Sequence, residues 1–222
     1  MLRGIIMIRK RFMGTTAALF LAAALTAAAP AAAFAAVPEN GYAAENTDIL
    51  SRPCPAGLEP DLWEMAKTNV QLYDAAIRTN LEAVNALRAS LHLNELALDP
   101  ELCLVASYRA AQINKDRYVT HYNDAGEYLA DKVVKAVTGD PEMSVGENYY
   151  YEPCDWARKH RDPADGALSN SLGLVTDGMT WLSNSSGHYV NLTDKAFTRM
   201  GIGVYLSPEE QPVLDTMVQI YK

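Results

Sequence analysis

The sequence predicts an α+β domain in which helices come first and a small antiparallel sheet follows. Apolar residues recur at steps of three and four from Trp63 to Leu91, which is the period of a helix buried along one face. Three extended segments rich in apolar residues come later, at residues 144–151, 197–206 and 213–221. Helices that precede the strands, rather than alternate with them, favour a layered α+β domain.

The first helical region begins at Asp61, because Asp61-Leu62-Trp63-Glu64 has the form of a capping box. Its apolar stripe comprises Trp63, Ala66, Val70, Tyr73, Ile77, Leu81, Val84, Leu87 and Leu91. A second capping box at Thr79-Asn80-Leu81-Glu82 leaves open whether this region is one helix or two helices broken near Thr79. Trp63 is expected to anchor the packing of this region.

Two further helices are predicted from their ends. Asp99-Pro100-Glu101 begins the first with a capping residue, a proline in the first turn and an acid near the positive end of the helix dipole. The other runs from Tyr128 to Val137 and stops before Gly139-Asp140-Pro141. We expect an irregular excursion over residues 154–173, a short helix over 174–182 and a turn over 208–212.

Residues 1–35 have the organisation of a secretory signal peptide. Basic residues lie near the start, residues 12–29 are apolar, and Ala33-Phe34-Ala35 resembles a cleavage site. The alternative is an uncleaved membrane anchor, since the apolar run is long enough to span a bilayer. No later apolar run is long enough to span a bilayer. We therefore expect an exported protein without an integral membrane segment after cleavage. Residues 36–60, which contain four prolines, read as a disordered or loop linker.

The charge balance limits the partners. The chain carries 19 Lys and Arg against 27 Asp and Glu, a net charge of −8. Cleavage after Ala35 would remove four basic residues and no acid, which gives −12. Such a surface repels nucleic acid and anionic lipid, but it leaves a small apolar ligand or a cation as a partner.

Cys54, Cys103 and Cys154 are the three cysteines. Export to an oxidising space permits one disulfide and leaves one thiol over. Cys54 and Cys154 both lie beside prolines in loop-like sequence, which favours that pair, although three free thiols are the alternative. Cys103 lies in a helical pattern and is expected to be buried as a small apolar residue.

Candidate functional residues come from two segments about forty residues apart. Val145-Gly146-Glu147-Asn148-Tyr149 supplies a carboxylate, and the segment from Trp181 to Leu192 supplies His188 among small polar residues. With His121 upstream, these residues predict one polar cleft. Asn148 and Asn184 are the expected hydrogen-bonding neighbours.

Six segments in this order resemble the CAP superfamily, the SCP-like extracellular domain, in its bacterial branch. They are Asn85-Ala86-Leu87-Arg88, Leu98-Asp99-Pro100-Glu101-Leu102, Thr120-His121, Gly146-Glu147-Asn148, Ser186-Gly187-His188-Tyr189-Val190-Asn191-Leu192 and Gly201-Ile202-Gly203-Val204. The resemblance covers residues 78–222 and leaves 61–77 as an extra N-terminal helix. It implies a three-layer α-β-α sandwich with a central cleft.

The resemblance also implies a site. In this family two histidines and two glutamates can line the cleft and hold a divalent metal. His121, Glu147 and His188 match three of these positions, whereas the fourth is Asn184 here. Two imidazoles and a carboxylate suit Zn²⁺ with an open coordination position. The alternative is a metal-free hydrogen-bonded network that satisfies buried polar groups.

Three functions remain open at this stage. The first is a secreted binding module that holds a small amphipathic or cell-envelope-derived molecule in the cleft. The second is a zinc-dependent hydrolase or protease, with Glu147 or a solvent relay as the base for a metal-bound water. The third is a non-catalytic interaction or structural protein. The cleft sequence lacks a G-x-S-x-G nucleophile elbow, and we therefore favour binding over catalysis.

Overall fold

A computed structural model of the protein describes residues 46–117, 119–153, 166–207 and 214–222. The helices in this part of the chain are α3 (Thr47–Ser51), α4 (Pro60–Leu72), α5 (Asp74–Ser90), α6 (Pro100–Asp116), α7 (Leu129–Thr138), α9 (Gly166–Asn184) and α10 (Ser186–Thr193). The strands are β1 (Ala97–Leu98), β2 (Gly146–Pro153), β3 (Arg199–Tyr205) and β4 (Leu214–Tyr221).

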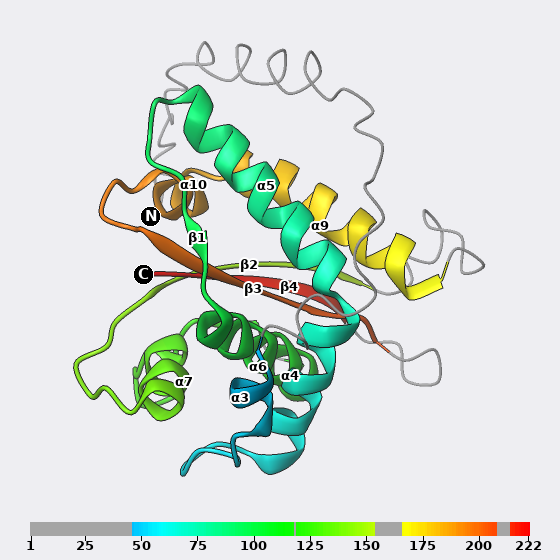
Figure 1. Ribbon diagram of the computed structural model, residues 1–222, viewed down its shortest axis with the longest axis vertical. Coiled ribbons are helices and arrows are strands. Elements are labelled where there is room, and N and C mark those ends of the chain that lie inside the picture. Colours follow the sequence, from blue (N-terminus) through cyan, green and yellow to red (C-terminus); the bar gives the residue numbers. More distant parts are fainter. Residues whose placement is uncertain (1–45, 118, 154–165, 208–213) are drawn as a thin grey trace, which may run out of the picture. The chain divides into compact units, whose positions relative to one another are not determined.

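One four-stranded sheet lies between two helical layers, with the strand order β1-β3-β4-β2. The helices α4, α6 and α7 lie on one side of the sheet, and α5, α9 and α10 on the other (Figure 1). The predicted α-β-α sandwich is confirmed. The sheet is mixed rather than wholly antiparallel, because the two-residue β1 pairs in parallel with β3, while β3–β4 and β4–β2 are antiparallel.

Helix α6 rests directly on strand β3. Asp99 caps it, accepting hydrogen bonds from the backbone N–H groups of Glu101 (3.0 Å) and Leu102 (3.2 Å), as predicted. A Cβ atom at Gly201 would lie 2.0 Å from the carbonyl carbon of Leu102, and one at Gly203 would lie 2.2 Å from that of Ala106. Backbone therefore meets backbone here, and only glycine fits at both strand positions.

The predicted first helical region is two helices, but the break lies at Tyr73 rather than near Thr79. Thr79 lies inside α5, so the second capping box is not used. Its neighbour Asn80 is fully buried, and its side-chain oxygen accepts a 2.8 Å hydrogen bond from Gln219 on β4. Asn80 therefore links α5 to the sheet from within the helix, and no helix begins at this point.

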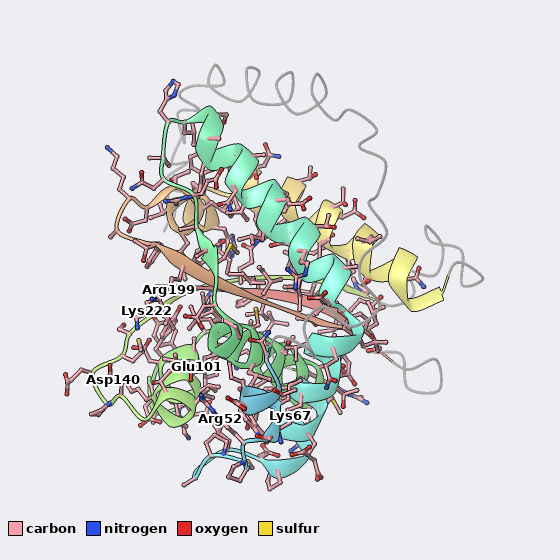
Figure 2. All side chains as sticks on the ribbon, viewed as in Figure 1. Arg52, Lys67, Glu101, Asp140, Arg199 and Lys222 are labelled. Carbon is pink, nitrogen blue, oxygen red and sulfur yellow. The ribbon has the colours of Figure 1, made fainter. Side chains whose placement is uncertain are left out.

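The segment before residue 78 shares the core of the domain. Trp63 is completely buried with Ala66 and Val70, which confirms its expected role as a packing anchor. Its indole N–H donates to the carbonyl of Arg52 at 3.3 Å, and Arg52 in turn pairs with Glu101 at the start of α6 (Figure 2). Helix α4 and the described end of the expected linker are thus integral to the packing, and the linker contains the short helix α3.

Residues 166–173 were expected to be irregular, but they form the beginning of α9, which extends to Asn184. Leu174, Val175 and Leu182 bury this helix against the sheet, and that burial outweighs the weak helix propensity of its glycines.

Residues 154–165, with Cys154, and residues 208–213 lie outside the described part of the chain. The Cys54–Cys154 pairing and the 208–212 turn therefore stay predictions. Cys103 is fully buried, as expected.

Candidate functional site

Glu147 lies on β2 with its side chain completely shielded from solvent. Its Oε1 accepts a hydrogen bond from Arg109 Nε at 2.8 Å, and its Oε2 lies 2.7 Å from His121 Nδ1. Arg109, on α6, is 1% exposed along its side chain. Two opposite charges buried together at this distance compensate each other, so the carboxylate is held inside the domain.

Arg109 also fixes the segment that carries His121. Its Nη2 donates to the carbonyl of Thr120 at 3.0 Å, and its Nη1 donates to Gln112. The sequence reasoning did not select Arg109. The signal was available, because Arg109 continues the buried helical face of Leu102, Val105 and Ala106 at the spacing i, i+3, i+4, i+7. An arginine on an apolar face needs a buried acid.

His121 takes its orientation from this pair. Because the ionised carboxylate of Glu147 only accepts hydrogen bonds, Nδ1 of His121 carries the proton that it donates. Nε2 is then the nitrogen left to face other groups. The ring packs against Tyr149 with 4.4 Å between ring centroids and lies 6.0 Å from Tyr128.

His188 reaches the same region from the opposite helical layer. It lies on α10, and its Nδ1 is 2.7 Å from the hydroxyl oxygen of Ser185. Its ring lies 4.9 Å from Trp181 and 6.3 Å from Tyr149. Burial first, and then repulsion by His121, lower the pKa of His188 below its usual value. This histidine is therefore kept neutral more readily than a free one.

The two predicted asparagines have different places. Asn148 is fully buried and joins β2 to α10: its Nδ2 donates to the carbonyl of His188 at 3.1 Å, and its Oδ1 accepts from Asn191 at 2.9 Å. Glu147 and Asn148 thus point to opposite faces of the sheet, as neighbours in a strand do. Asn184 is exposed, and its amide donates to the carbonyl of Thr180 one turn earlier.

Asn85 and Arg88 hold the framework behind the site. Arg88 is fully buried, and its guanidinium donates to the carbonyls of Leu192 and Asp194, both at 3.0 Å. Asn85 exchanges two hydrogen bonds with the backbone of Leu96. The N-x-x-R pattern therefore fixes the end of α10 and the approach to β1.

A pocket of about 490 Å³ opens beside the edge strand β2. Its lining residues are Val119, His121, Tyr149, Tyr150, Tyr151, Trp181 and His188. The volume lies in the range of small-molecule sites, roughly 300–1,000 Å³. Both predicted histidines line it, whereas Glu147, Asn148 and Asn184 do not. Glu147 lies behind the lining residues and orients His121 by a hydrogen bond.

The side chains that the resemblance implies as metal ligands have other partners in this structure. In the described ranges, no group of three or more His, Cys, Asp or Glu side chains is arranged to hold a metal ion. Both oxygens of Glu147 are engaged by Arg109 and His121, and each histidine has its Nδ1 engaged. Two Nε2 atoms are the donors that remain, which is fewer than the three protein ligands typical of catalytic zinc.

Residues 81–221 match the cysteine-rich secretory protein family, CAP. The chain belongs to the CAP family. The match agrees with the resemblance drawn from residues 78–222 and leaves α4 just outside it. No curated protein matches the chain, and among the described helices none is long and apolar enough to cross a membrane.

Three solved structures resemble this CAP protein. An outer surface protein from Borrelia burgdorferi is 16% identical, with a TM-score of 0.48, over 65% of this chain and 89% of that one. An extracellular SCP-domain protein from Bacillus anthracis is 21% identical, with a TM-score of 0.47, over 75% and 45%. A cysteine-rich secretory protein from Staphylococcus aureus is 14% identical, with a TM-score of 0.42, over 69% and 41%. The chain thus spans less than half of the latter two.

Proposed function

We propose that this CAP protein is an exported binding module that holds a small amphipathic, cell-envelope-derived molecule in the pocket beside β2. The expected leader and the secretory character of the family support export. The observation that carries the binding role is the lining of the pocket, in which aromatic faces surround two imidazoles. Such a wall buries apolar groups and offers few polar contacts to orient them.

The same lining favours binding over hydrolysis. The seven described lining residues include no serine, cysteine or carboxylate, so none of these seven is a typical activated nucleophile or carboxylate base. Glu147 bonds to His121 but does not line the pocket, and its pair with Arg109 holds it behind that histidine. A zinc-dependent hydrolase would need the third donor that this arrangement withholds.

Native mass spectrometry tests the proposal. The purified protein is incubated with detergent-solubilised bacterial phospholipids and, separately, with soluble peptidoglycan fragments. We expect a bound species that Trp181→Ala and His188→Ala each reduce at least fivefold. His92→Asn is the matched control, because His92 is exposed with a positive φ of 57° that asparagine tolerates. Equal binding by all variants would remove the pocket as the site.

A further inference from the structure

Six of the seven described residues that line the pocket carry an aromatic or imidazole ring, and the seventh is Val119. None of the seven carries a fixed charge. Among the described lining residues, an anion would therefore find no lysine or arginine, and a primary ammonium would find no carboxylate to replace its water. The wall offers ring faces, which carry the negative side of the aromatic quadrupole.

These rings are inclined to one another rather than coplanar. Along the wall, His121 and Tyr149 enclose 34°, Tyr149 and His188 enclose 64°, and His188 and Trp181 enclose 52°. Trp181 and Tyr150 continue the series at 44° with 5.9 Å between centroids. A flat ligand such as a sugar ring suits a single plane of aromatic groups, whereas inclined faces surround a compact, rounded group.

The electrostatics of the surroundings favour a cation. Behind His121, the charges of Arg109 and Glu147 compensate each other. His188 is held towards its neutral form by burial and by His121. The chain as a whole carries a net charge of −8, which attracts cations over long distances. The described wall of the pocket thus carries no fixed positive charge that would oppose an organic cation.

We propose that the pocket is an aromatic cage for a quaternary ammonium group, such as a choline-type headgroup. The inference rests on the proposed binding function and names its ligand class. A quaternary ammonium joins a positive charge to an apolar surface, and aromatic cages recognise that combination through cation–π attraction. A compact primary ammonium is strongly hydrated and fits the same walls less well.

The test compares three probes that differ in one property each. Choline, its uncharged carbon isostere 3,3-dimethylbutan-1-ol, and ethanolamine are titrated into the purified protein, with binding followed by NMR shifts of the Trp181 indole N–H. We expect choline to bind at least tenfold more tightly than either of the others. An isostere that binds as tightly as choline would overturn the cage and leave an apolar binding pocket intact. No binding of choline would also overturn it.

Variants locate the effect and identify the source of the headgroup. Trp181→Leu keeps apolar area and removes the ring, so we expect choline affinity to fall at least fivefold while the isostere changes less than twofold. Leu72→Ala, exposed on α4, is the control and should change neither. Vesicles of phosphatidylcholine and of phosphatidylglycerol then distinguish a lipid headgroup from a free solute. Retention on phosphatidylcholine alone identifies the lipid headgroup, and retention on neither identifies the solute. Stronger retention on phosphatidylglycerol would contradict the cage.

Discussion

The two histidines that line the pocket are held in opposite ways. His121 is supported by a buried carboxylate, which is itself paired with a buried arginine on the central helix. His188 is supported by the hydroxyl of Ser185 at the start of the short helix α10. The first support is ionic and deep, while the second is neutral and near the surface. On one wall, His121 donates from Nδ1 to a carboxylate. On the other wall, His188 has a lowered pKa.

The largest effect is expected from breaking the ionic support. Glu147→Gln leaves the Arg109 guanidinium buried without a counter-charge, which should cost about 3–5 kcal/mol of unfolding free energy. Urea denaturation measures it. Glu101→Gln removes the partner of Arg52 in a pair that is about 43% and 32% exposed, and should cost less than about 1 kcal/mol. A loss of similar size in both variants would contradict the ionic anchoring of His121.

The neutral wall depends on the amide bridge from β2 to α10. Asn148→Ala removes the donor to the His188 carbonyl and the acceptor for Asn191, and should destabilise the protein by about 1–3 kcal/mol. Amide hydrogen exchange should accelerate in α10 more than in α6. Asn184→Ala, at an exposed position on α9, is the matched control and should leave exchange in α10 unchanged. Unaltered exchange after Asn148→Ala would show that other contacts hold α10.

The lowered pKa of His188 is measurable directly. In an NMR titration His188 should have a pKa below 6.5, because of burial and then of His121. The unfolded chain binds this proton more readily, so the contribution of His188 to stability is complete above pH 6.5 and is lost as pH falls through the lower folded-state pKa. His121→Gln should raise the pKa of His188, because it removes the repulsion by His121. An unchanged pKa of His188 in His121→Gln would show that His121 does not influence the charge of His188.

Zinc should produce the smallest effect. With Glu147 engaged by Arg109 and His121, only the two Nε2 atoms remain as donors in this site, and chelator treatment should shift the melting temperature by less than about 1 °C. Zinc titration of wild type and His121→Ala, followed by calorimetry and elemental analysis, checks this. Stoichiometric zinc that survives gel filtration in wild type and is lost in His121→Ala would show that Glu147 leaves its pair to become a ligand.

Much of the framework could be predicted from the sequence because its signals are local. Asp99 and Pro100 mark the start of α6, and the alternation and turns around residues 146–153 and 199–221 indicate strands. The break at Tyr73 and the parallel strand β1 could not be predicted. Thr79-Asn80-Leu81-Glu82 looks like a capping box until the partner of Asn80 on β4 is known, and a strand of two residues shows no period. Helix α10 was hidden by Ser185, Ser186 and Gly187, which are typical of turns.

The candidate site also contains residues that could be predicted from the sequence and residues that could not. Family-like segments selected His121, Glu147 and His188, and the structure places the two histidines in one pocket and Glu147 against His121. The place of Arg109 on an apolar helical face indicates that it needs a buried acid, but the sequence does not say which acid, because Glu147 lies 38 positions away. The exposure of Asn184 also depends on where α9 ends, and the sequence pattern predicted that helix to be shorter.

The glycines at 201 and 203 have a consequence for how the pocket admits a guest. Because Gly201 and Gly203 have no side chains, the backbone of α6 lies directly against the backbone of β3. This close packing resists sliding of α6 along the sheet. The wall that α6 supports is therefore stationary. Widening is easier at the opposite wall, where Trp181 on α9 is joined by His188 on the eight-residue helix α10. The contacts of α10 are made by amides, hydroxyls and carbonyls that can exchange partners with water.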